Sequence, residues 1–114
     1  MTIKKSGYFE EISVRMTEFA KALAHPARLE ILETLAQKDH CNCGEIVSKL
    51  PLAQSTVSQH LRELKNSGII SRENEGSKSQ YAIEWLELES HFQALGKFAD
   101  KLKTFKNIHK PQIL

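Results

Sequence analysis

The sequence predicts a mainly α-helical protein with one small β-hairpin, an α+β fold of about five helices plus a two-stranded wing. Apolar residues recur every three or four positions in five separate stretches, which is the spacing of helices with one buried face. Between residues 69 and 83, two short runs typical of strands flank turn-forming residues. Two helices joined by a short turn come directly before this hairpin, so the order is that of a winged helix-turn-helix.

The size and composition of the chain fit one ordinary soluble domain. Its 114 residues can form a single hydrophobic core, so we expect residues 1–114 to make one domain. The net charge of +2 permits a nucleic-acid partner without requiring one, because phosphate binding depends on where charges cluster. The sequence shows neither a secretion signal nor the roughly 18 apolar residues of a membrane span, so we expect a cytoplasmic protein with no membrane partner.

The first helix is expected at residues 8–23, after a loose arm at residues 1–7. Its apolar positions recur at intervals of three or four. Phe9 and Phe19 make this stripe more apolar than packing within one chain requires, which favours contact with a second subunit.

The pair His25-Pro26 separates the first helix from a second one, expected at residues 26–37. The residue before a proline is disfavoured in the helical region, whereas proline itself suits the first turn of a helix. A polar turn at residues 38–42 then leads to a short third helix, expected at residues 44–50.

The fourth helix, expected at residues 54–66, carries the main functional signal. Val57, Leu61 and Leu64 fall on one face, at the spacing of a helix docked on a core. The opposite face has short or planar side chains that donate and accept hydrogen bonds, as base edges in the major groove require. Polar faces are common on surface helices, so this interpretation also depends on the neighbouring elements. The polar face consists of Gln54, Ser55, Thr56, Gln59, Arg62 and Asn66.

The hairpin is expected as two strands, at residues 69–73 and 79–83, around a turn at residues 74–78. A hairpin directly after a helix-turn-helix is a wing. Arg72 and Lys78 lie near its tip, where cationic side chains could reach phosphates or a minor groove.

The last helix is expected at residues 84–105, where apolar residues step by three, four or seven positions. Because it follows the wing, little of its own domain remains for this stripe to cover, which favours a dimer seam. Residues 97–110 carry five lysines against one aspartate and are expected to form a solvated tail, with a minor DNA contact as the alternative. The expected dimer contacts are Phe9, Ile12, Met16, Phe92, Leu95 and Leu102.

Three blocks of the sequence together resemble the ArsR/SmtB family of bacterial winged-helix repressors: ALAHPARLEIL at 22–32, GEIVSKL at 44–50 and QSTVSQHLRELKNSGII at 54–70. The resemblance implies a homodimer joined by its first and last helices. It also implies that the fourth helix enters the major groove of a double-stranded DNA operator, and that an inducer relieves repression. By position, the candidate DNA contacts are Gln54, Ser55, Thr56, Ser58, Gln59 and Arg62.

Two histidines fall within the matched blocks. His60 corresponds to a family histidine on the fourth helix, and we interpret it as partly buried and hydrogen-bonded rather than as a phosphate contact. His25 lies at a helix junction and is also interpreted as structural.

The cysteines leave the sensing chemistry open. Cys41 and Cys43 are too close in sequence to staple a fold, which favours a reducing compartment. Metal-sensing members of the family carry an ELCVCDL-type motif, whereas HCNCGEI here places each cysteine one position away and puts Cys43 where a core-facing valine is usual. Cys41 and Cys43 with His40 could bind a soft metal or metalloid ion or act as a thiol sensor, but they fall short of a closed four-ligand site. We therefore expect no cofactor, with metal or thiol sensing by this pair as the alternative.

The family's second metal site is expected to be absent. That site lies on the last helix, and Glu89 and His91 supply its first half. The second half would fall near Leu102 and Phe105, which cannot bind a metal.

Two other classes of function were compared with DNA binding. A winged-helix module that docks on a protein should expose large apolar residues on its fourth helix, and none lies on the polar face. An enzyme should show a nucleophile with its base, a glycine-rich phosphate loop or an HExxH-type metal motif, and the sequence has none of these. We expect a DNA-binding regulator that is not an enzyme.

Overall fold

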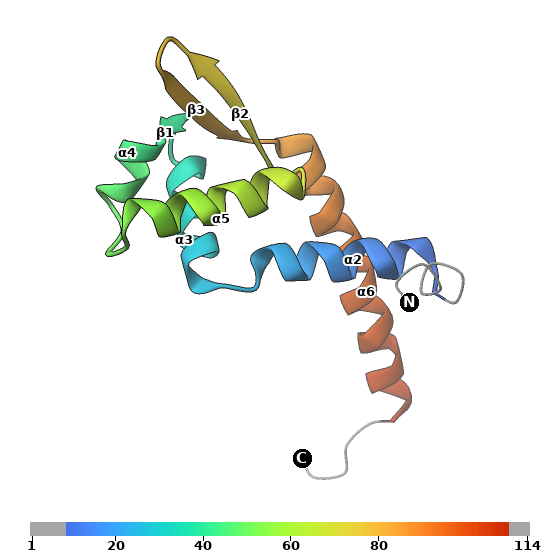
Figure 1. Cartoon of the computed structure of the whole chain (residues 1–114). Coiled ribbons are helices and arrows are strands. Elements are labelled where there is room, and N and C mark those ends of the chain that lie inside the picture. Colours follow the sequence, from blue (N-terminus) through green and yellow to red (C-terminus); the bar gives the residue numbers. More distant parts are fainter. Residues whose placement is uncertain (1–8, 110–114) are drawn as a thin grey trace.

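The computed structural model describes residues 9–109, apart from the side chains of Glu75 and Asn107. The arm expected at residues 1–7 and the first expected helical residue, Tyr8, lie outside this range. The mainly α-helical fold with a small sheet is confirmed (Figure 1). The described elements are, in chain order, α2 (Glu11–Leu23), α3 (Pro26–Ala36), β1 (Cys41–Asn42), α4 (Cys43–Val47), α5 (Gln54–Asn66), β2 (Ile70–Glu75), β3 (Lys78–Ile83) and α6 (Trp85–Ile108).

The core lies where α3, α4 and α5 meet beneath the hairpin. Val57, Leu61 and Leu64 of α5 are fully buried, as the helical spacing predicted. They belong to one cluster with Ile31 of α3 and Ile46 of α4. Because each of these three helices buries one stripe in the same cluster, the position of α5 depends on both neighbours.

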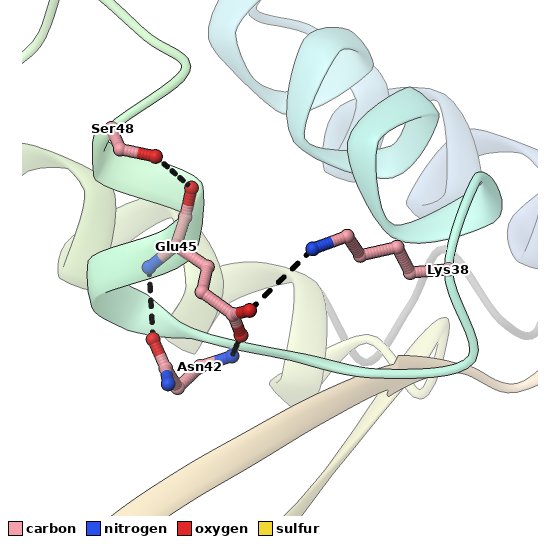
Figure 2. Close-up of polar contacts among 4 residues, drawn as sticks. All are labelled: Lys38, Asn42, Glu45 and Ser48. Atoms are coloured by element: carbon pink, nitrogen blue, oxygen red, sulfur yellow. Dashed lines mark hydrogen bonds and ion pairs between the residues drawn. The ribbon is translucent and has the colours of Figure 1, made fainter.

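The helix α4 begins one residue earlier and ends three residues earlier than predicted. Asn42 caps it: the side-chain oxygen accepts a hydrogen bond from the Glu45 backbone N–H at 2.8 Å, and the Glu45 carboxylate accepts from the Asn42 N–H at 2.9 Å (Figure 2). This reciprocal capping box fixes the first turn. At the other end, the Ser48 hydroxyl donates to the Glu45 carbonyl at 2.7 Å (Figure 2), and the chain then leaves the helix.

The sheet has three strands in the order β1-β3-β2. The predicted two-stranded wing is present as β2 and β3, whereas the prediction of a plain turn at residues 38–42 is wrong, because Cys41 and Asn42 form a third strand. Cys41 and Asn42 pair antiparallel with Tyr81 and Gln80 of β3. Two residues are too few to show a strand period in a sequence, which explains the miss. The wing strands β2 and β3 are longer than predicted and leave only Gly76-Ser77 as the turn, where Gly76 has a φ of +61°. Glycine at the first central position suits a two-residue hairpin of type II′.

The helices α2 and α6 pack against each other (Figure 1), and Phe19 and Ala22 of α2 and Leu88 of α6 belong to the same core cluster. The C-terminal half of α6 projects past the other elements, and the structure measures 58 × 39 × 24 Å. The radius of gyration of the whole structure is 17.7 Å, which exceeds the roughly 13 Å of a compact domain of this length. The lysine-rich segment expected to be a tail is mostly part of α6, with Lys110 outside the described range. No helix within residues 9–109 is long and apolar enough to cross a membrane.

Candidate nucleic-acid interface

The outer face of α5 presents free polar side chains. Gln54, Ser55, Gln59 and Arg62 are all exposed, on the side of the helix opposite the fully buried Val57. Within the described part of the chain, none of these four side chains makes a hydrogen bond or an ion pair. Their donors and acceptors are therefore available to a partner, and the large apolar residues expected of a protein-docking helix are missing from this face.

The other two predicted contacts on α5 lie at the edges of this face. Thr56 and Ser58 are half-buried. The Ser58 hydroxyl lies 3.6 Å from the Cys43 sulfur, so it also faces α4. Six predicted residues thus share one helix surface, but only four of them stand fully in solvent.

The inner side of α5 is tied to the rest of the fold through His60, which is 8% exposed. The Arg28 Nε donates to the His60 Nδ1 at 3.1 Å, and the rings of His25 and His60 are 4.3 Å apart. Burial first, and then the neighbouring His25 and Arg28, lower the pKa of His60. A neutral His60 can accept the hydrogen bond from Arg28, so the prediction of a buried, bonded histidine is confirmed.

His25 has a structural role at the start of α3. Its Nδ1 accepts a hydrogen bond from the Ala27 backbone N–H at 3.0 Å, which satisfies one of the free donors of that helix. This confirms the structural interpretation of His25. Sequence reasoning missed Arg28, the hydrogen-bond partner of His60, because nothing in the pattern pairs it with a residue 32 positions away.

The wing holds its cationic side chains on an exposed hairpin. The Arg72 Nε donates to the Ser79 hydroxyl at 2.9 Å, and this hydroxyl donates to the Asn74 side-chain oxygen at 3.1 Å. Arg72 is therefore held across the hairpin, and its remaining N–H groups make no hydrogen bond to the side chains that the structure describes. Lys78 is exposed at the first position of β3.

The two cysteines differ in burial from the expectation. Cys41 is 1% exposed and belongs to the core, whereas Cys43, predicted to be the core-facing one, is half-buried at its edge. Register explains this, because Cys41 lies on the strand that pairs with β3. Burial, reinforced by the nearby Glu45 carboxylate, raises the pKa of the Cys41 thiol. Within residues 9–109, no three side chains of His, Cys, Asp or Glu gather closely enough to hold a metal ion.

His91, which the resemblance assigns to a metal site on the last helix, contacts Phe19 and Glu87 in the structure. His91 is 8% exposed, stacks on the Phe19 ring at a centroid distance of 4.4 Å, and lies 3.4 Å from the Glu87 carboxylate. Leu102 and Phe105, at the positions of the missing second half, are about half exposed.

A second surface of interest is the apolar face of α2 and α6. On α6 the face begins with Leu88, buried against the same chain, and continues in solvent along the projecting half. Of the six predicted dimer contacts, five have exposed fractions near one half and Met16 is half-buried. The exposed ones are Phe9, Ile12, Phe92, Leu95 and Leu102.

Comparison with known proteins places these features in a family. Residues 25–72 match the family described as "Bacterial regulatory protein, arsR family". An uncharacterized HTH-type transcriptional regulator of Mycobacterium tuberculosis is 40% identical over 67 residues, and the match spans 58% of each chain. The transcriptional repressor PagR of Bacillus anthracis is 35% identical over 78 residues, which cover 68% of this chain and 78% of PagR.

The fold has a solved counterpart. The structure of HlyU from Vibrio cholerae matches with a TM-score of 0.66 and 30% identity, covering 79% of this chain and 97% of that one. The match to the mycobacterial protein leaves more than a third of that relative's length without a counterpart. The relatives are named as regulators of transcription, which agrees with the prediction that this chain is not an enzyme.

Proposed function

The chain belongs to the ArsR family of bacterial regulatory proteins, and we propose that it is a dimeric, sequence-specific DNA-binding regulator of transcription. In this proposal α5 reads the major groove and the wing of β2 and β3 flanks it. The observation that carries the proposal is the outer face of α5, where four exposed polar side chains have no partner within the described chain. Such side chains match the donors, acceptors and methyl groups of base edges.

The apolar face supports the proposed dimerisation through α2 and α6. Monomeric proteins rarely expose large contiguous apolar surfaces. Here the exposed apolar stripe begins next to Leu88 and Phe19, which are buried within the same chain. The projecting half of α6 has no neighbour to cover it within the described chain. A second copy would bury both stripes about a two-fold axis, as most homodimers do.

The regulator is proposed to be a repressor that works in the cytoplasm, where its DNA is. PagR is named as a repressor, whereas HlyU of Vibrio cholerae is named as an activator, so both outcomes are represented among relatives. The sign of regulation is a property of where the operator lies relative to the promoter, and a reporter gene behind that operator would measure it directly.

The test is selection of DNA by the reduced, purified protein from a random duplex library, followed by fluorescence anisotropy. We expect an enriched, roughly palindromic site with half-sites about 10 bp or a multiple apart. Binding should fall steeply as salt rises from 50 to about 200 mM, since cationic side chains release counterions from phosphates. If no sequence is enriched and no duplex binds at low salt, the proposal is wrong and a protein-docking module becomes the better interpretation.

A thiol-responsive form of this function rests on the contact of Cys43 with α5. Its sulfur lies 3.6 Å from the Ser58 hydroxyl, so a group added to that sulfur would press on the reading helix. Adding mild oxidant, or Zn(II), Cd(II) or As(III), to the anisotropy assay tests sensing by Cys41 and Cys43. Release of DNA by wild type but not by Cys43→Ala would support it, and equal binding throughout would remove it.

A further inference from the structure

Arg28 joins three helices at one point. It lies in the first turn of α3 and is half-buried. Its Nε donates to His60 on α5, while its Nη1 lies 3.3 Å from the Lys21 carbonyl and 3.2 Å from the Ala22 carbonyl in the last turn of α2. The Lys21 carbonyl also accepts the Ala24 backbone N–H at 3.2 Å, so Arg28 is a second donor to it. The residue four positions after Ala22 is Pro26, which has no N–H to donate, so the guanidinium supplies a donor to the Ala22 carbonyl, and the dipole of α2 favours a cation at this end.

We propose that Arg28 is a positioning residue that fixes the angle between α2 and the reading helix α5, and so sets the half-site spacing that the dimer accepts. This inference rests on the proposed function. In this proposal Arg28 does not contact DNA. Arg28 acts because one rigid, planar group holds the dimer helix and the reading helix at the same time.

The length of α5 makes such an angle matter. Its 13 residues span about 20 Å, so a tilt of about 10° moves one end by roughly 3.4 Å. That displacement is close to the rise of one base pair, and two reading helices must meet half-sites a whole helical turn apart. A loosened α5 should therefore accept altered spacing and bind the preferred spacing less well.

The arrangement also requires a neutral His60. The charged or titratable groups facing it are His25 at the α2–α3 junction, Arg28 on α3 and Glu63 on α5. Burial and the first two of these groups lower the pKa of His60 below the ordinary value of 6.5, whereas Glu63 opposes them. The bond from Arg28 is therefore present at neutral pH, and protonation in more acidic solution removes its acceptor.

The experiment compares three duplexes: the one selected by wild type, and two with the half-site spacing changed by one base pair in either direction. The variant Arg28→Gln removes the charged fork. The variant Lys21→Gln is the matched control, because it removes one positive charge at the same helix end but keeps its carbonyl. The variant His60→Asn keeps an acceptor near the Nδ1 position and cannot be protonated near neutral pH. Circular dichroism melting confirms that each variant is folded.

We expect Arg28→Gln to lower affinity for the preferred duplex by about 10-fold, the effect of one charge-assisted hydrogen bond, and for the altered duplexes by much less. Lys21→Gln should lower all three affinities by one common factor. Wild type should lose its spacing preference only as the pH falls through the folded pKa of His60, which lies below the ordinary 6.5, and His60→Asn should keep the preference.

Equal losses on all three duplexes for a folded Arg28→Gln would overturn the inference while leaving DNA binding intact. Acid sensitivity of spacing that persists in His60→Asn would overturn it as well. If wild type selects no sequence, the proposed function fails, and this inference fails with it.

Discussion

Replacing Asn42 by alanine should destabilise the fold by a predictable amount. Its side-chain oxygen accepts the hydrogen bond of the Glu45 N–H at 2.8 Å, and alanine leaves that donor without a protein partner. Loss of an N-cap of this kind costs about 1 kcal/mol, within a range of about 0.5–2. At about 2.1 cal/mol/K per residue, the unfolding entropy of 114 residues is roughly 0.24 kcal/mol/K, so the melting temperature should fall by about 4 °C.

The assay is thermal unfolding followed by circular dichroism, with wild type and variant at equal concentration because a dimer's melting point depends on it. Asn42→Asp is the matched control, since aspartate caps about as well and should melt close to wild type. A melting point unchanged in Asn42→Ala would refute the assignment of the capping box.

The other half of the capping box gives this region a pH dependence. The Asn42 N–H, more than any other neighbour, lowers the pKa of the Glu45 carboxyl, with a smaller contribution from Lys38 (Figure 2). A lowered folded pKa means that the stabilisation is present above the unfolded value of about 4.5 and is lost as the pH falls through the folded value. Glu45→Gln lacks this pH-dependent stabilisation, so the difference in free energy of unfolding between wild type and the variant should shrink as the pH drops below 4.5. A difference that does not change with pH would contradict a lowered pKa of Glu45.

Three further predictions concern helix capping, thiol reactivity and assembly. Ala53 starts α5 without a side-chain cap, so Ala53→Ser should raise the stability by about 1 kcal/mol and the melting temperature by about 4 °C, and an unchanged melting curve would contradict this. The half-buried Cys43 should react with a thiol reagent at pH 8 in minutes, while the core thiol of Cys41, whose pKa burial raises, should react only on unfolding; a fast phase that survives in Cys43→Ala would reverse the assignment. Leu102→Glu should reduce the mass in light scattering from twice 13.0 kDa to 13.0 kDa, while Leu86→Glu, off the stripe and 87% exposed, should not; equal masses for both variants would reject α6 as the seam.

Most of the fold could be predicted because its helices bury one stripe each. Val57, Leu61 and Leu64 mark the buried face of α5, and the predicted range was correct at both ends although Ala53 supplies no side-chain cap to mark the start. The strand β1 was missed because two residues carry no period. The capping box at Asn42 moved the start of α4 by one residue, and that signal is present in the sequence as Asn followed three residues later by Glu.

Part of the candidate interface could also be predicted from the helical period. Exposed side chains on a helix follow from its period, so the outer face of α5 was accessible to sequence reasoning. The contact of Arg28 with His60 was not, because a hydrogen bond between residues 32 positions apart depends on how two helices cross. The burial of Cys41 rather than Cys43 likewise depended on a strand pairing that the pattern did not reveal.

The central claim is that the outer face of α5 reads base edges, and one comparison tests it most directly. Gln59 in the second turn of α5 and Asn66 in its last turn are exposed amides on the same face. Gln59→Ala and Asn66→Ala therefore remove the same chemical group at two positions along the helix. Anisotropy titrations at fixed salt give the affinity of each protein for the selected duplex and for random DNA, and the difference between the two binding free energies is its discrimination. We predict that Gln59→Ala lowers discrimination by about 1–3 kcal/mol while Asn66→Ala leaves it unchanged. Equal loss on both DNAs for Gln59→Ala, or undiminished discrimination, would contradict base reading by this face.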